Sequence, residues 1–357
     1  MSPEIPKPES LGIRNFADYA RIIDARTPKE FAEDHIPGAT NLPIVSQDEF
    51  AEVGTLHRTN PHAAYLIGAQ YALRNVANYI GSVIAGHGPR ERLLVYCFRG
   101  GKRSRAWAEP LRNIGYAVDV LPGGWKAYRA WVRTTLDSYT PQLPWRVLGG
   151  STACGKTRLL QALVAEGAQV LDLEGLASHR GSLLGALPGQ PQPTQKGFDS
   201  LLLQTLRGLD PARPIWVEAE SKKIGNVQLP GPLHEAMQAA PTWIVSAPMA
   251  ARVEVCRQDY AHYAADPLAM VRQLEPIKPL VGGETLAHWQ ALAAAGDSDA
   301  LFASVMERHY DPCYARSMRR AHRLKDLALA GVDEASLKAG ALRLIAEASL
   351  TEAPASP

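Results

Sequence analysis

Residues 145–165 read WRVLGGSTACGKTRLLQALVA: an apolar run, a loop bounded by glycines, and a run with leucines at helical spacing. The loop Gly150-Ser151-Thr152-Ala153-Cys154-Gly155-Lys156-Thr157 fits the P-loop pattern G-x-x-x-x-G-K-[ST] in full, between an expected strand at 146–150 and an expected helix at 157–167. In that setting the loop amides and the helix N-terminus bind a diphosphate, Lys156 reaches the terminal phosphate, and Thr157 can hold Mg²⁺. We interpret Cys154, inside the loop, as a small side chain that fills space.

Short apolar runs alternate with helical patterns on both sides of this loop. They predict buried strands at 20–25, 92–98, 118–124, 168–174, 214–220 and 242–248. Helices are expected from Thr27, with Glu30 completing a capping box, and over residues 62–85. The alternation predicts the α/β class, with a parallel sheet in each half.

The segment 138–145 carries two prolines and no periodicity, which is typical of a linker. We therefore expect an N-terminal domain at 1–137 and a P-loop domain at 146–282. Residues 283–357 are rich in Ala and Leu and are expected to form a helical C-terminal extension.

Composition excludes several classes of protein. The chain has 357 residues, a net charge of +2, 46% hydrophobic and 21% charged residues, which fits about two globular domains and excludes wholesale disorder. No apolar stretch approaches the roughly 18 residues of a membrane span, and the start lacks the apolar core of a secretory signal. Four scattered cysteines without CxxC spacing argue against a disulfide scaffold or a structural metal. We expect a cytoplasmic protein with no membrane contact and no tightly bound cofactor.

A second loop, Cys97-Phe98-Arg99-Gly100-Gly101-Lys102-Arg103-Ser104, follows the expected strand at 92–98. Its glycines let successive amides converge on one point, and a helix begins near Ser104. Together with the cations Arg99, Lys102 and Arg103, these groups favour a thiolate, so Cys97 is predicted to be an acidic nucleophile. The alternative is an inert buried cysteine.

The pattern Cys97-x5-Arg103 after a strand resembles the active-site loop of the rhodanese family. Two other segments are similar to rhodanese signatures, Asp24-Ala25-Arg26 with the residues up to Asn41, and Leu121-Pro122-Gly123-Gly124-Trp125. The resemblance implies a rhodanese-like fold in which the loop cysteine carries sulfur or selenium and the loop amides cradle the outer atom.

Charge is concentrated in two segments. Residues 90–133 hold ten cations and three acids, a net +7, and a second cluster holds Arg308, Arg316, Arg319, Arg320, Arg323 and Lys325. Such patches can contact a polyanion, although solvated helix faces look the same. Trp125, Tyr128 and Trp131, interleaved with Lys126 and Arg129, are candidates for stacking a base, with ordinary core packing as the alternative.

Carboxylates end two of the expected strands. Asp172 and Glu174 end one, and Glu218 and Glu220 end another. One of them can hold magnesium beside Thr157, or all of them can be exposed strand ends; the sequence leaves both interpretations open.

The combination of the two loops resembles the tRNA 2-selenouridine synthase family over about residues 12–325. The resemblance extends to Leu173–Ser182, Val217–Gly225 and His309-Tyr310-Asp311-Pro312-x-Tyr314, while Ala153-Cys154 and Ala219 depart from the expected pattern. It implies additional cleft residues, namely His179, Arg180, Ser182, Glu218, Glu220, Ser221, Lys222 and Lys223.

The reaction that this family carries out has two stages. Geranyl diphosphate alkylates the sulfur of wobble 2-thiouridine in tRNAs for Lys, Glu and Gln, and selenium from selenophosphate then replaces the geranylthio group. The resemblance implies that the P-loop binds geranyl diphosphate, with Mg²⁺ aiding departure of diphosphate. It implies that Cys97 handles selenium, a perselenide being one form, and that Arg99, Gly100, Gly101, Lys102 and Arg103 bind selenophosphate. The implied partners are the tRNA anticodon arm and, transiently, a selenophosphate-producing enzyme.

Three other functions remain open on the sequence. An ATP-activated tRNA sulfurtransferase would use a Cys97 persulfide and hydrolyse ATP at the P-loop. A non-catalytic RNA-binding protein would tolerate loss of Cys97. A thiosulfate sulfurtransferase would use the first domain alone.

Overall fold

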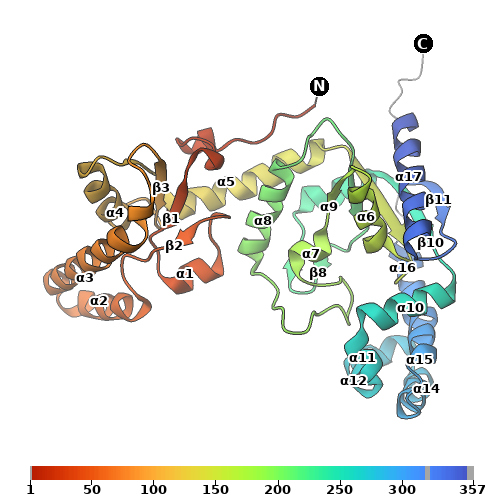
Figure 1. The fold of residues 1–357 in the computed structure, drawn as a ribbon. Coiled ribbons are helices and arrows are strands. Elements are labelled where there is room, and N and C mark those ends of the chain that lie inside the picture. Colours follow the sequence, from red (N-terminus) through yellow and green to blue (C-terminus); the bar gives the residue numbers. More distant parts are fainter. Residues whose placement is uncertain (1, 318–321, 352–357) are drawn as a thin grey trace. The chain divides into compact units, whose positions relative to one another are not determined.

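The protein contains two parallel β-sheets, each packed with helices, in the computed structural model (Figure 1). The structure describes residues 2–317 and 322–351. Ile5–Leu136 and Pro193–Arg207 form one unit, the N-terminal unit. Asp137–Gln192 and the chain from Gly208 onward form the second, the P-loop unit. The predicted α/β class with parallel sheets is confirmed.

The sheet of the N-terminal unit has the order β2-β1-β3-β4, with all neighbours parallel. Its strands are β1 (Arg21–Asp24), β2 (Thr40–Asn41), β3 (Arg92–Tyr96) and β4 (Ala117–Val120). Its helices are α1 (Pro28–Glu33), α2 (Gln47–Thr59), α3 (Pro61–Ser82), α4 (Lys102–Asn113), α5 (Gly124–Tyr139) and α8 (Gln195–Arg207), with short 3₁₀ turns at Pro8–Leu11, Phe16–Asp18 and Ile84–Gly86.

Local signals in the sequence explain where helices α1 and α2 begin. Thr27 and Glu30 form the predicted capping box, in which the Thr27 hydroxyl accepts from the Glu30 amide and the Glu30 carboxylate accepts from the Thr27 amide. Ser46 and Glu49 form the same motif ahead of α2, a helix that the sequence analysis did not predict. The Ser-x-x-Glu spacing was the signal that could have found it.

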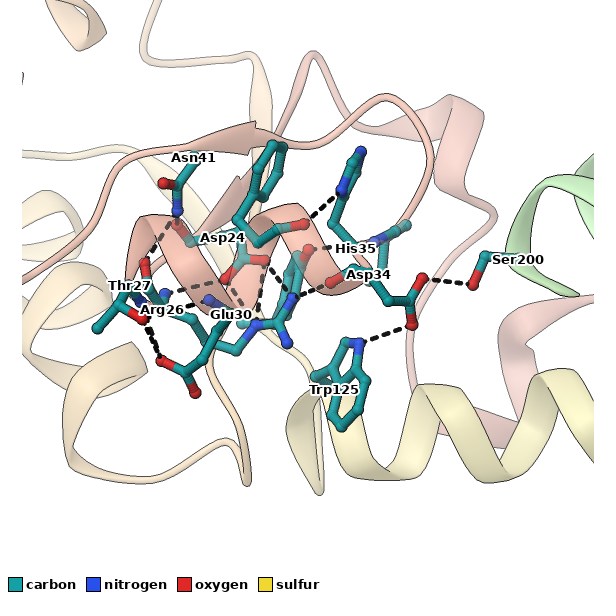
Figure 2. Close-up of polar contacts among 12 residues, drawn as sticks. Asp24, Arg26, Thr27, Glu30, Asp34, His35, Asn41, Trp125 and Ser200 are labelled. Carbon is teal, nitrogen blue, oxygen red and sulfur yellow. Dashed lines mark hydrogen bonds and ion pairs between the residues drawn. The ribbon is translucent and has the colours of Figure 1, made fainter. Parts of the chain in front are cut away.

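A buried polar network centred on Asp34 ties α1, α5 and α8 together (Figure 2). Asp34 is 2% exposed, and its carboxylate accepts from the Trp125 indole at 2.9 Å and from the Ser200 hydroxyl at 2.8 Å. Arg129 approaches the same carboxylate at 3.5 Å and pairs with Asp199 at 2.8 Å. These contacts explain why residues 193–207 pack with the N-terminal unit. The domain boundaries expected from the sequence, with a P-loop domain at 146–282, stay a prediction.

The sheet of the P-loop unit has the order β11-β10-β5-β7-β6, again with all neighbours parallel. The strands are β5 (Trp145–Gly150), β6 (Gln169–Leu171), β7 (Ile215–Glu218), β10 (Pro241–Ser246) and β11 (His322–Ala328), beside a small hairpin of β8 (Lys223–Ile224) and β9 (Val227–Gln228). The P-loop strand β5 is central, which places its loop between the ends of two neighbours.

Helices of the P-loop unit cover the sheet and extend beyond it. They are α6 (Lys156–Ala165), α7 (Leu173–Ala177), α9 (Gly231–Ala239), α10 (Met249–Asp259), α11 (Ala261–Ala265), α12 (Pro267–Leu274), α13 (Lys278–Val281), α14 (Gly283–Ala294), α15 (Ser298–Val305), α16 (Asp311–Ser317) and α17 (Glu334–Thr351), with 3₁₀ turns at Thr140–Gln142 and Glu275–Ile277 and a π-helical turn at Met306–Tyr310. Apolar side chains of α6 and α17 pack together over one face of the sheet.

Two features of this unit correct the sequence analysis. The region 283–357, predicted to be a helical extension, contributes strand β11 to the sheet, because Leu327 and Leu329 join the same core as α6. The expected linker at 138–145 is also structured: α5 continues to Tyr139, a 3₁₀ turn covers Thr140–Gln142, and Trp145 begins β5.

We expect Asp34→Ala to lower the free energy of unfolding of the N-terminal unit by about 3 kcal/mol, because it removes the acceptor of buried indole, hydroxyl and guanidinium donors. Urea denaturation followed by tryptophan fluorescence measures this. Glu33→Ala is the matched control: Glu33 pairs with Lys196 at the surface, so its loss should cost less than about 1 kcal/mol. Equal effects of the two substitutions would contradict a stabilising role for the network.

Candidate active sites

The Cys97 thiol lies at the end of β3 in a cradle of hydrogen-bond donors. Burial opposes ionisation, but hydrogen bonds from the Ser104 hydroxyl and from the amides of Arg99, Gly101 and Ser104 outweigh it and lower the pKa of Cys97. The Ser104 hydroxyl is buried, and among the described residues it makes no hydrogen bond of ordinary geometry, which leaves it available to the thiolate. The local fold therefore stabilises a thiolate at this position.

Glycines allow the backbone to close around the Cys97 loop. Gly100 and Gly124 have φ of +65° and +60°, and a Cβ on Gly124 would overlap the Cys97 carbonyl oxygen and the Gly100 amide. The Trp125 amide donates to the Cys97 carbonyl at 2.8 Å. The segment Leu121–Trp125 thus packs against the Cys97 loop and fixes its backbone.

The three predicted cations of the loop are placed differently from one another. Arg103 forms an ion pair with Glu30 at 2.8 Å, so its charge is largely compensated. Arg99 and Lys102 are exposed. The main stabilisation of the thiolate comes from hydrogen bonds rather than from these side-chain charges.

We expect Cys97 to react with iodoacetamide at a lower pH than an ordinary thiol, and Ser104→Ala to move the midpoint of its pH–rate profile upward, because the thiolate loses a donor. The labelled peptide is quantified by mass spectrometry. Cys256, whose pKa burial raises to about 12, is the internal control and should stay unlabelled below that pH. An unchanged Cys97 midpoint in Ser104→Ala would contradict the role of the hydroxyl.

The P-loop connects β5 to α6, with Gly155 at φ +90° as the N-cap of the helix. Lys156 donates to the Gly150 and Ser151 carbonyls at 2.8 and 3.1 Å. Burial opposes the charge of Lys156, but nearby Cys154, Tyr314 and two glutamates outweigh it and raise its pKa, so the side chain stays cationic. Amides at a helix N-terminus and a buried ammonium form a setting for phosphate groups.

The two departures within the P-loop have structural consequences. Ala153 has φ +60°, a left-handed conformation that costs an alanine roughly 1 kcal/mol more than a glycine. Cys154 is fully buried in the core with Leu159 and Val245, and burial raises the pKa of its thiol. Cys154 therefore packs as a small apolar side chain.

Three glutamates meet beside the P-loop. The ligand atoms of Glu174, Glu218 and Glu220 lie within 4.8 Å of one another. Burial, followed by the charges of the other carboxylates, raises the pKa of Glu174 to about 9 and that of Glu220 to about 7. Asp172 is not part of this group, since it caps α7 by accepting from the Gly175 amide.

The residues present fit a magnesium ion. Glu218 is 4% exposed, contacts the Thr157 hydroxyl, and keeps one buried carboxylate oxygen without a partner among the described residues. Carboxylate and hydroxyl oxygens are the ligands that Mg²⁺ prefers in proteins. Burial of Glu218 excludes the alternative in which it is an exposed strand end.

A cavity of about 960 Å³ opens beside the P-loop. Among the predicted diphosphate-binding residues, Thr152, Ala153, Gly155, Lys156 and Thr157 line it. Among the predicted cleft residues, Arg180, Ser182, Glu220, Ser221 and Lys222 line it as well. The structure does not bring His179 or Lys223 to this lining: His179 is buried against Gly185 and Gly225, and Lys223 is exposed on β8.

C-terminal residues complete the cavity, and the sequence analysis gave them no role. Tyr310, Cys313 and Tyr314 line it, and the Tyr314 hydroxyl accepts from the Gly150 amide at 2.5 Å. Arg252 donates to the Thr152 carbonyl at 2.9 Å and pairs with Asp311 at 2.6 Å. The segment from Asp311 to Tyr314 thus fixes the P-loop; its only signal in the sequence was the resemblance in His309–Tyr314.

The hypothesis that Trp125 and Tyr128 stack a base is wrong. They are 7% and 2% exposed, and Trp125 donates to Asp34, so both belong to the interior of the unit. Trp131 is half-buried and packs edge-on against Phe16. In the second basic cluster, Arg319 and Arg320 lie outside the described residues, as does the side chain of Arg323.

Two family models match successive parts of the chain. Residues 12–130 match the model of the rhodanese-like domain, and residues 143–278 match the model of the tRNA 2-selenouridine synthase AAA domain. A protein named tRNA 2-selenouridine synthase from Cupriavidus necator is 32% identical over 349 residues, covering 88% of this chain and 94% of that protein. The chain belongs to the tRNA 2-selenouridine synthase family.

Other members of the family are similar over shorter stretches. The one from Aeromonas salmonicida is 38% identical over 70% of this chain and 67% of its own length, and the one from Nitrosomonas europaea is 35% identical over 67% and 63%. A solved N-terminal domain of a Clostridium difficile 630 protein is 32% identical and covers 36% of this chain and 98% of that chain, with a TM-score of 0.31.

Among the described residues, no helix combines the length and apolarity needed to span a membrane.

Proposed function

We propose that this protein is a tRNA 2-selenouridine synthase that works in two steps on wobble 2-thiouridine. The P-loop unit transfers a geranyl group from geranyl diphosphate to the sulfur, and the Cys97 loop then directs its replacement by selenium from selenophosphate. Family membership supports the tRNA-modifying activity. The observation that supports the division into steps is the presence of two strand–loop–helix sites of different chemistry, one with a stabilised thiolate and one with a buried lysine beside carboxylates.

In the first step, the thiocarbonyl sulfur attacks C1 of the geranyl group, and the carbon–oxygen bond to diphosphate breaks. The P-loop amides and Lys156 would bind the diphosphate and stabilise the charge that develops on it. Thr157 and Glu218 would hold Mg²⁺, which supplies further charge compensation when bound. S-alkylation turns a poor leaving group into a thiol that can depart.

In the second step, the Cys97 thiolate attacks C2 of the alkylated base and expels geranylthiol. Selenium of selenophosphate then displaces Cys97 from C2, and water cleaves the selenium–phosphorus bond to release phosphate. These reactions regenerate the Cys97 thiolate and need no oxidant or reductant. A Cys97 perselenide formed from selenophosphate would need an oxidant, so this proposal does not include one.

The test uses purified protein, a tRNA bearing 2-thiouridine, geranyl diphosphate and selenophosphate, with nucleosides weighed by mass spectrometry. Wild type should form 2-selenouridine, Cys97→Ala should stop at geranylated thiouridine, and Lys156→Ala should leave thiouridine unmodified, because each variant removes one step. Lys223→Ala, an exposed cation away from the cavity lining, is the matched control for Lys156→Ala and should behave as wild type.

ATP hydrolysis with no change in nucleoside mass would overturn the proposal and favour the ATP-activated sulfurtransferase. Full activity in Cys97→Ala would favour a protein in which the Cys97 loop only binds RNA.

A further inference from the structure

Each of the three cations in the Cys97 loop lies against an aromatic ring. Lys102 lies 4.2 Å from the centre of the Tyr65 ring, Arg103 lies 5.7 Å from that of Phe50, and Arg99 lies 5.7 Å from that of Phe98. We call the rings of Phe50, Tyr65 and Phe98 the aromatic rim. Two of them come from α2 and α3, helices that pack along each other in Figure 1.

Two rings of the rim are exposed although they are large and apolar, and Phe98 is half-buried. Tyr65 is 54% and Phe50 44% exposed. The His57 and Tyr65 rings are nearly perpendicular, with centres 5.6 Å apart, so Tyr65 contacts both an imidazole and the Lys102 ammonium. A fixed, exposed aromatic face is a feature that the fold itself does not need.

The charge around the rim favours an anionic partner. Lys102 and Arg99 are exposed cations. Three acids near the rim are already paired: Glu49 binds Arg74 and Asn75, Glu52 accepts from Tyr71, and Glu30 pairs with Arg103. Flat rings beside free cations match single-stranded nucleic acid, whose bases stack and whose phosphates are negative.

We propose that the aromatic rim binds the single-stranded part of the substrate RNA, with an unstacked base on Tyr65 and the adjacent phosphates against Lys102 and Arg99. The inference rests on the proposed function, which needs a wobble base to leave its stack and reach Cys97. Lys102, which lies against Tyr65, belongs to the same loop as Cys97, so the rim adjoins the segment that carries the thiol. The rim takes the place of the buried Trp125 and Tyr128 as the stacking surface.

Binding of a fluorescently labelled anticodon stem–loop RNA, measured by anisotropy, tests the inference. Tyr65→Ala should weaken binding by about tenfold, the size of one lost base stack, whereas Tyr65→Phe keeps the ring and should bind within about twofold of wild type. Leu73→Ala, on the same helix and 63% exposed, is the control and should bind as wild type. A blunt RNA duplex should bind equally to wild type and Tyr65→Ala, since it offers no free base.

Two results would overturn the inference. Unchanged affinity in Tyr65→Ala would show that no base stacks there. Equal losses in Tyr65→Ala and Leu73→Ala would indicate an extended apolar surface for a protein partner instead.

Nucleoside analysis on the same proteins separates this inference from the proposed function. If wild type forms 2-selenouridine but Tyr65→Ala binds RNA with unchanged affinity, only the proposed role of the aromatic rim is contradicted. If Tyr65→Ala loses RNA affinity but wild type forms no modified nucleoside, the proposed function is contradicted and the RNA-binding role of the rim is supported.

Discussion

Both candidate sites depend on one backbone arrangement: a parallel strand that ends in a glycine-containing loop at the N-terminus of a helix. In the N-terminal unit, β3 leads through Gly100 and Gly101 into α4. In the P-loop unit, β5 leads through Gly155 into α6. In each unit, the loop amides and the helix dipole favour negative charge at the carboxyl end of the strand that precedes the loop. The two sites differ in their side chains. The Cys97 thiolate carries the negative charge itself, whereas the Lys156 ammonium is suited to bind an anionic ligand.

The P-loop unit concentrates charges that are costly to bury, and the C-terminal segment stabilises their positions. Glu174, Glu218 and Glu220 converge near Lys156, and burial raises the pKa of each carboxyl. A divalent cation and a diphosphate would satisfy these groups together. Arg252 and Tyr314 hold the loop itself through the Thr152 carbonyl and the Gly150 amide. Residues distant in sequence from the P-loop are therefore part of its site.

Sequence patterns predicted the features that local chemistry determines. The strands around both loops, the capping box at Thr27 and the α/β class follow from short-range periodicity and hydrogen bonding. Strand β11 was missed because its sequence, HRLKDLA, is interrupted by charged residues and lacks a continuous apolar run. The inward orientation of Trp125 was missed because its partner Asp34 lies on another element. The exposure of Tyr65 depends on how α2 and α3 pack, which composition does not report.

In the proposed mechanism, alkylation and selenation depend on different loops. The most direct measurement supplies tRNA that already carries S-geranyl-2-thiouridine, together with selenophosphate, to the Lys156→Ala variant. We expect this variant to form 2-selenouridine at about the wild-type rate, because the step that needs the P-loop has been bypassed and the Cys97 loop is intact. Failure of Lys156→Ala to convert this tRNA, under conditions where wild type converts it, would contradict the claim.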